Sequence, residues 1–96
     1  MIPGQDIADI LREIKPELSR RFHVSKIGYF GSFADGTFDE DSDVDILVEF
    51  AETPGWEFFD LQILLEQTFQ RKVDLVTTKA LKAALKDRIL AQTLFV

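Results

Sequence analysis

The segment VDILVEF, residues 44–50, restricts the fold most strongly because its residues alternate between two chemical characters. Such alternation is typical of a β-strand with one buried face, since successive strand side chains point to opposite faces. The face expected to be buried carries Val44, Ile46, Val48 and Phe50. The opposite face carries Asp43, Asp45, Leu47 and Glu49. The sequence therefore predicts a strand that begins with two carboxylates on the same side.

The rest of the chain alternates between helical and strand-like segments. Apolar residues at helical spacing predict three helices, one of which follows Thr53-Pro54, a favoured N-cap and first helical residue. Short runs of β-branched and aromatic residues predict two further strands. In chain order, these elements are a helix over 5–21, a strand over 24–30, a helix over 54–69, a strand within 71–78 and a helix starting at Thr78.

The order α-β-β-α-β-α indicates an α/β (α+β) fold with a mixed sheet of at least three strands packed by helices. A chain of 96 residues, 46% of them apolar, is expected to form a single domain over residues 1–96. We expect Trp56 to pack at the start of the 54–69 helix, or else to line a partner interface. The apolar end, Leu94–Val96, is expected to dock on the sheet or on a partner.

The composition excludes several classes of function. The chain has no cysteine, so it has no disulfide, thiolate nucleophile or cysteine-ligated zinc. A net charge of -6 argues against a surface that wraps nucleic acid, so direct nucleic-acid binding is not expected. The sequence has no apolar run that could cross a bilayer, and charges interrupt the N-terminal segment where a secretory signal would be apolar. We therefore expect a soluble, cytoplasmic protein without membrane contact.

Seven acidic residues lie between residues 31 and 50, and they are either solvated or hold a metal. A Gly-containing connection without periodicity is expected to be a solvated loop, and it carries Asp35, Asp39, Glu40 and Asp41. Asp43 and Asp45 differ because a strand would hold their carboxylates close together, where they repel each other unless a cation intervenes. Carboxylate oxygens on a rigid strand suit Mg²⁺.

Asp74 is the only acidic residue in RKVDLVTT, where it interrupts an apolar strand. If this strand lies beside the 44–50 strand, three carboxylates converge, as a two-metal phosphoryl-transfer site requires. The alternative is that Asp74 faces water, or pairs with Arg71 or Lys72.

Gly31-Ser32 ends the first predicted strand, and the next three residues could form a helical turn. Backbone N–H groups and the Ser32 hydroxyl would then be placed to hold phosphate oxygens, and Gly31 would let a phosphate approach the backbone. Alone, a Gly-Ser pair most often marks an ordinary turn.

Taken together, these motifs resemble a known signature. Gly31-Ser32, ten intervening residues and Asp43-Val44-Asp45 match the G-S-x10-D-x-D pattern of the nucleotidyltransferase superfamily, whose fold is like the polymerase β palm. Asp74 falls in a strand of the kind that carries the third carboxylate of that superfamily. The whole chain is similar to the minimal nucleotidyltransferase family, whose members are antitoxin partners of HEPN-domain toxins.

The resemblance implies a role for each motif residue. Asp43, Asp45 and Asp74 would be catalytic and would hold Mg²⁺, as two ions, while Gly31 and Ser32 would bind the nucleotide. The implied substrate is ATP, and the implied reaction transfers AMP to a hydroxyl, that of a tyrosine, on a HEPN-domain toxin. The resemblance also implies a hetero-oligomer with that toxin.

One position departs from the family pattern. Members commonly carry Arg four residues after the motif glycine, where this chain has Asp35. An anion in place of a cation beside a triphosphate weakens nucleotide binding if the position faces the site, and has little effect if it is exposed. The alternative interpretation is therefore a catalytically weak or inactive binding module that neutralises its partner by forming a complex.

Overall fold

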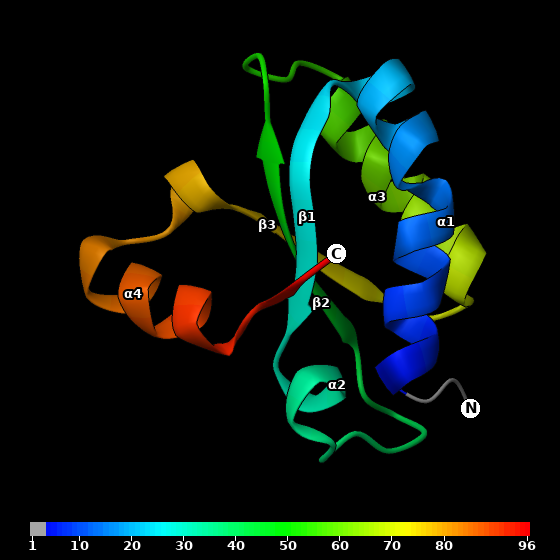
Figure 1. The fold of residues 1–96 in the computed structure, drawn as a ribbon, viewed down its shortest axis with the longest axis vertical. Helices are drawn as coiled ribbons and strands as arrows, with labels where there is room; N and C mark the ends of the chain where they lie inside the picture. The colour runs from blue at the N-terminus through cyan, green and yellow to red at the C-terminus, as the bar shows by residue number, and fades with distance from the viewer. Residues whose placement is uncertain (1–3) are drawn as a thin grey trace.

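The computed structural model describes residues 4–96, and it describes side-chain surroundings from residue 7 onward. Its elements are α1 (Gly4–Phe22), β1 (Val24–Phe30), α2 (Ser32–Asp35), β2 (Val44–Phe50), α3 (Glu57–Phe69), β3 (Val73–Thr77), the 3₁₀ helix η1 (Thr78–Ala80), α4 (Ala83–Gln92) and β4 (Leu94–Phe95) (Figure 1). All the predicted helices and strands are present in the predicted order. The short helix α2 matches the helical turn expected after Gly31, and the short elements η1 and β4 are added.

The strands form one sheet in the order β3-β2-β1-β4. Strand β2 runs parallel to β3 and antiparallel to β1, and β4 runs antiparallel to β1. Helix α3 connects the two parallel strands, which cannot be joined by a tight turn. The predicted α/β (α+β) fold with a mixed sheet packed by helices is confirmed.

Helices α1 and α3 cover one face of this sheet (Figure 1). The residues of β2 and β3 that contribute to the core under these helices are Val44, Ile46, Val48, Val73 and Leu75. Because core residues occupy alternate strand positions, Asp45 and Asp74 face the opposite side of the sheet. The predicted alternation of the 44–50 strand thus decides which side carries the carboxylates.

The C-terminal segment crosses that opposite side. Strands β3 and β4 form the two edges of the sheet, so the chain passes from one edge to the other through η1 and α4. Figure 1 shows α4 on the side away from α1 and α3. Leu47, which the alternation assigns to the polar face, is nevertheless fully buried and lies outside the core cluster.

Two predicted helix starts are wrong. Helix α3 begins at Glu57 rather than residue 54, because the Glu57 carboxylate accepts a hydrogen bond from the Gly55 N–H and organises the turn there. The last helix begins at Ala83 rather than Thr78. The Thr77 hydroxyl accepts the Ala80 N–H and closes a 3₁₀ turn first.

The aromatic and C-terminal predictions have different outcomes. The expected packing of Trp56 at the helix start is wrong, since 81% of this residue is exposed. The docking of the C-terminus on the sheet is confirmed, because β4 pairs with β1 and the Val96 N–H donates to the Ile27 carbonyl. Between residues 4 and 96, the helices lack the combination of length and apolar character needed to cross a membrane.

Candidate functional site

Asp45 and Asp74 lie directly beside each other on neighbouring strands. The parallel register of β2 and β3 pairs their Cα atoms, and adjacent strands lie about 4.8 Å apart. Both side chains point to the sheet face away from α1 and α3, because the residues on either side of each belong to the core. The predicted adjacency of the two strands is therefore confirmed, and it brings two of the three carboxylates together.

The electrostatic environment of Asp45 reflects this proximity. Partial burial raises the pKa of its carboxyl group to about 6, with further contributions from the negative charges of Asp74 and then Asp43. Asp43 and Asp74 are both exposed, whereas Asp45 is half-buried. A cation at this point would relieve the repulsion that the three carboxylates impose on one another.

Gly31 brings the backbone against the same carboxylate. It follows β1, whose last residue, Phe30, pairs with Asp45 across the sheet. Gly31 has φ of 70° and ψ of -145°, a conformation that is accessible almost only to glycine. A Cβ atom at residue 31 would overlap Oδ2 of Asp45. The absence of a side chain at Gly31 is therefore what gives the Asp45 carboxylate its space.

Ser32 opens α2, a single helical turn that the sequence predicts correctly. The N–H groups of Ala34 and Asp35 donate to the Gly31 carbonyl, and the Gly36 N–H donates to the Ser32 carbonyl. Ser32 is half-buried, and its hydroxyl makes no hydrogen bond to another described residue. The hydroxyl is thus available to a ligand beside Gly31.

The acidic connection between α2 and β2 is solvated, as predicted. The four acidic side chains expected to be solvated are exposed: Asp35 at the end of α2, and Asp39, Glu40 and Asp41 in the connection. The Asp35 carboxylate accepts hydrogen bonds from the Thr37 hydroxyl at 2.6 Å and the Thr37 N–H at 2.9 Å. These bonds, from the hydroxyl first and then the N–H, lower the pKa of Asp35. Asp35 therefore shapes its own turn at an exposed position.

Arg71 is a contributor that the sequence did not single out for this role. Its guanidinium donates to the carbonyls of Asp39, Glu40 and Ser42, at 3.3, 3.0 and 2.8 Å. It also lies 5.2 Å from the centre of the Phe33 ring, over its face. Arg71 thus connects the acidic loop to the start of β3 and holds the backbone that immediately precedes Asp43.

The alternative predicted for Asp74 is exposure to water or an ion pair with Arg71 or Lys72, and only the first is found among the described residues. Asp74 faces water, but no ion pair joins it to Arg71 or Lys72 within the described part of the chain. Arg71 is occupied by the loop carbonyls instead.

The donor set of the site fits a hard cation. All three side chains offer carboxylate oxygens, which are the ligands that Mg²⁺ prefers. Among the described side chains, no three Asp, Glu or His residues already stand together as a metal-binding group. Asp43, which is exposed at the end of the loop, would have to turn towards Asp45 and Asp74 to complete one.

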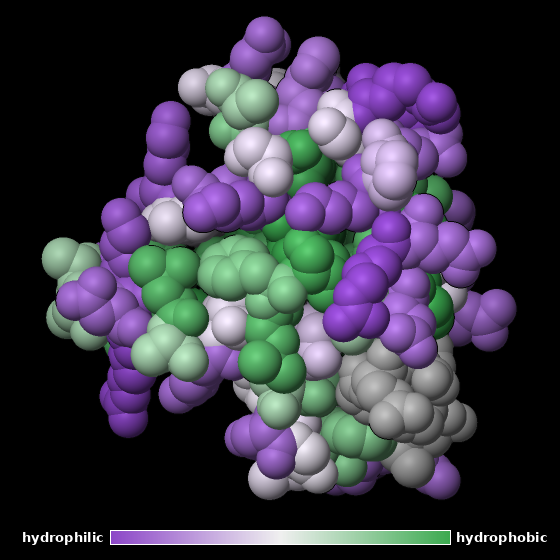
Figure 2. Space-filling view, viewed as in Figure 1, coloured by the Kyte–Doolittle hydropathy of each residue, from purple (hydrophilic) through white to green (hydrophobic). Residues whose placement is uncertain are grey.

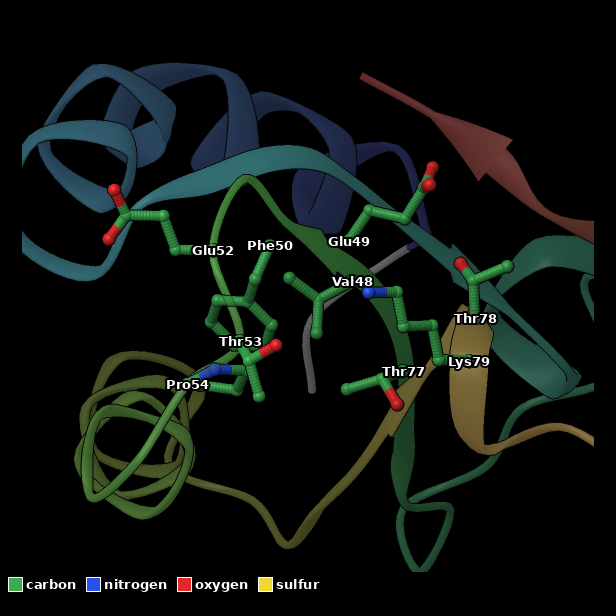
Figure 3. A pocket seen from close by; sticks show the side chains of 9 residues that line it. All are labelled: Val48, Glu49, Phe50, Glu52, Thr53, Pro54, Thr77, Thr78 and Lys79. Carbon is green, nitrogen blue, oxygen red and sulfur yellow. The ribbon is translucent and has the colours of Figure 1, made fainter.

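A separate cavity of about 270 Å³ lies at the other end of β2 and β3 (Figure 3). Its lining residues are Val48, Glu49, Phe50, Glu52, Thr53, Pro54, Thr77, Thr78 and Lys79. These residues belong to the last part of each strand and to the segments that follow it, whereas Asp45 and Asp74 each stand second in their strand. The cavity and the carboxylate site are therefore distinct.

Comparison with known proteins gives consistent relatives. Residues 11–96 match the family described as nucleotidyltransferase domain. The protein adenylyltransferase MntA of Thermococcus cleftensis is 41% identical over 97 residues, which cover 100% of this chain and 98% of the relative. A solved minimal nucleotidyltransferase is 26% identical with a TM-score of 0.83, covering 97% of this chain and 95% of the other.

A crystal structure of a toxin-antitoxin with AMP-PNP is also similar. It is 27% identical, has a TM-score of 0.69, and covers 96% of this chain and 70% of that one. The family match, the full-length relative and the shared fold agree with the carboxylate pair and the Gly-Ser turn. The chain belongs to the nucleotidyltransferase domain family and is a nucleotidyltransferase.

Proposed function

We propose that this chain transfers AMP from ATP to a tyrosine hydroxyl of a HEPN-type toxin, and that it acts in the cytoplasm as the antitoxin of that partner. The observation that carries the proposal is the pairing of Asp45 with Asp74 beneath the side-chain-free backbone of Gly31. The 41% identity to a protein adenylyltransferase over the whole chain supports AMP transfer to a protein. The similar toxin-antitoxin structure with AMP-PNP supports both the nucleotide and the class of partner. The tyrosine rests on the family resemblance.

Asp43, Asp45 and Asp74 are the residues that would hold Mg²⁺, as two ions. When bound, Mg²⁺ supplies positive charge that neutralises the triphosphate. The raised pKa of Asp45 supports this assignment, because its partial burial and then the charges of Asp74 and Asp43 disfavour the ionised carboxylate, which a cation would stabilise.

Gly31 and Ser32 would bind the phosphates. The backbone at Gly31 lies against the Asp45 carboxylate, which occupies the side where a Cβ would stand, so a phosphate held there would lie beside Asp45. The N–H groups at the start of the α2 turn and the Ser32 hydroxyl are donors of the kind that phosphate oxygens accept. They would fix the β- and γ-phosphates while Asp45 stands beside the reacting end.

Asp74 would act on the acceptor. It is exposed on an edge strand, so a hydroxyl carried by another protein can reach it. Its carboxylate would take the proton as the acceptor oxygen bonds to the α-phosphorus and the bond to the β-phosphate breaks, which releases pyrophosphate. The product is an AMP ester on the partner.

The test is intact-mass analysis of the HEPN-type partner after incubation with this protein, ATP and Mg²⁺. We expect an AMP-sized mass increment that disappears with Asp43→Ala/Asp45→Ala and persists with the loop control Asp41→Asn. If the partner gains no mass, although the complex forms and the toxin remains inhibited, the catalytic proposal fails. The alternative suggested by Asp35, a binding module that neutralises its partner by forming a complex, would then hold. In that case Mg²⁺-ATP would not raise the melting temperature of this chain either.

A further inference from the structure

Helix α4 lacks a packed face. Within its residues 83–92 none is buried, residues 83–88 are all exposed, and only Ile89 and Leu90 are half-buried. An isolated helix of ten residues is marginal in water, and helices in proteins are stabilised mainly by packing an apolar face. The exposed apolar residues of α4 and the adjacent β4 are Leu85, Leu94 and Phe95, with 46, 48 and 44% of their surface accessible.

Leu85 and Phe95 lie on the side of the sheet that carries the carboxylates. Phe95 pairs with Gly28, whereas Leu94 pairs with the core residue Tyr29, so strand alternation turns Leu94 towards the side of α1. The segment from β3 to β4 crosses the face to which Asp45 and Asp74 point, whereas α1 and α3 cover the other face (Figure 1). Figure 2 shows hydrophobic side chains gathered over α4 and the C-terminal segment in this view. We call Leu85 and Phe95, with the basic residues described next, the α4–β4 surface.

The charge of this segment is opposite to that of the chain. Residues 79–88 contain four basic side chains and one acidic one, in a protein with a net charge of -6. The basic residues are all exposed: Lys79, Lys82, Lys86 and Arg88. None of them forms an ion pair with another described residue. They are free to pair with carboxylates of another protein.

We propose that the α4–β4 surface docks the protein that receives AMP, through an apolar patch of that partner bordered by carboxylates. The inference rests on the proposed function, because the acceptor hydroxyl must reach the nucleotide beside Asp45 and Asp74. That point lies on the face of the sheet that α4 crosses, whereas α1 and α3 cover the other face. Contact there gives α4 the packing partner that it lacks and pairs its cations.

A second exposed apolar group provides the matched control. Trp56 and Phe59, at the start of α3, are 81 and 56% exposed, and their ring centroids lie 6.1 Å apart. They belong to the layer on the opposite side of the sheet, beside the acidic residues Glu57 and Asp60. A partner held there would stand behind the sheet, away from the nucleotide.

The test compares three variants with the wild type: Leu85→Gln/Phe95→Gln, the charge variant Lys82→Glu/Lys86→Glu, and the control Trp56→Gln/Phe59→Gln. All the replaced side chains are exposed, so the fold should tolerate each change. Calorimetry would give the Kd for the purified, unmodified HEPN-type partner, and intact mass would give the rate of AMP transfer. The melting-temperature shift produced by Mg²⁺-ATP would show whether the nucleotide site is intact.

We expect both α4–β4 variants to raise the Kd at least tenfold and slow AMP transfer, with an unchanged Mg²⁺-ATP shift, while the control stays within about twofold of the wild type. The proposal is overturned if both variants bind as the wild type does, or if only the control weakens binding. The variants could instead change the oligomeric mass of this chain in solution without the partner and leave the partner affinity unchanged. That result would identify a second copy of this chain as the occupant and would also overturn the proposal. If the wild type binds but transfers no AMP, the proposed function fails, and the Kd values still decide the docking surface.

Discussion

The Asp45 carboxylate packs so closely against Gly31 that residue 31 cannot carry a side chain. An ideal Cβ there would overlap the Asp45 carboxylate and lie 3.1 Å from its Cγ. The two residues are separated by fourteen positions, yet the antiparallel pairing of β1 with β2 brings them together. The glycine of the Gly-Ser turn and the second Asp of the Asp-x-Asp motif therefore form a single contact.

Gly31→Ala should cost more stability than Gly36→Ala. Both glycines have positive φ, 70° and 84°, but a Cβ at Gly36 meets no atom within 4 Å. Gly36→Ala should therefore cost only the backbone strain, about 1 kcal/mol. Gly31→Ala adds the overlap with Asp45 to a more strained conformation, and we expect a loss of about 3 kcal/mol in urea unfolding. Equal losses would contradict the contact, and Asp45→Ala should restore part of the loss in Gly31→Ala.

The raised pKa of Asp45 makes the stability of the metal-free protein depend on pH. The group titrates at about 6 in the folded chain, against its ordinary value of 3.8. The protonated Asp45 carboxyl group therefore contributes its full stability below about pH 4. This contribution is lost as the pH rises through 6, because the folded chain holds the proton more tightly than the unfolded chain does and must release it.

Asp45→Asn should remove this dependence. At pH 7.5 in EDTA we expect the variant to be more stable than the wild type by about 1 kcal/mol, a figure reduced for the partial exposure of the group. At pH 3.5 the two proteins should unfold at the same urea concentration. Added Mg²⁺ should stabilise the wild type and leave Asp45→Asn nearly unchanged. A variant less stable than the wild type at pH 7.5 would contradict the assignment.

Asp74→Asn and Asp41→Asn should separate the site carboxylates from those of the loop. Both residues are exposed acids, but only Asp74 is in register with Asp45. We expect Asp74→Asn to reduce AMP transfer by about 100-fold or more, as loss of a transition-state electrostatic contact does. Asp41→Asn should remain within about twofold of the wild type. Asp74→Asn should also lower the pKa of Asp45, which carboxyl NMR would detect.

Asp35, the position that departs from the motif pattern, should affect nucleotide binding little. Its carboxylate is exposed and is turned to Thr37, and solvent screens the field of such a charge. We expect Asp35→Asn to change the affinity for Mg²⁺-ATP less than about threefold at 0.15 M salt. A change above tenfold would mean that Asp35 touches the nucleotide.

The sequence predicts most of the features that depend on local periodicity. The alternation in residues 44–50 assigns Asp45 to the face opposite the core, and the structure agrees, because a strand's side-chain period leaves no other choice. The register that pairs Asp45 with Asp74 joins two strands that are far apart in the sequence, and no local pattern encodes it. From the residues alone, Asp74 is expected beside Asp43 and Asp45 only if the two strands are neighbours, and the resemblance to known nucleotidyltransferases favours that condition.

The mispredictions have causes that local sequence patterns do not record. Thr53-Pro54 is a strong helix-start signal, but Glu57 takes the Gly55 N–H and the helix begins later. The exposure of Trp56 could not be predicted from the sequence either, because the burial of an aromatic side chain depends on which residues of other elements pack against it. Arg71 was missed for a related reason, since its acceptors are backbone carbonyls 29 to 32 residues away, and carbonyls carry no sequence signal.

Arg71→Lys should loosen the acidic loop and weaken the enzyme without disturbing the core. One guanidinium nitrogen serves three carbonyls while the group lies over Phe33, and a lysine ammonium cannot reproduce that planar contact. We expect a loss of about 1–2 kcal/mol in urea unfolding and faster amide hydrogen exchange in residues 36–43. AMP transfer should fall, because the loop leads directly into Asp43. Arg20→Lys is the matched control, since Arg20 forms only an exposed ion pair with Glu17 and should change none of these readouts. Unchanged exchange in the loop of Arg71→Lys would show that Arg71 does not hold it.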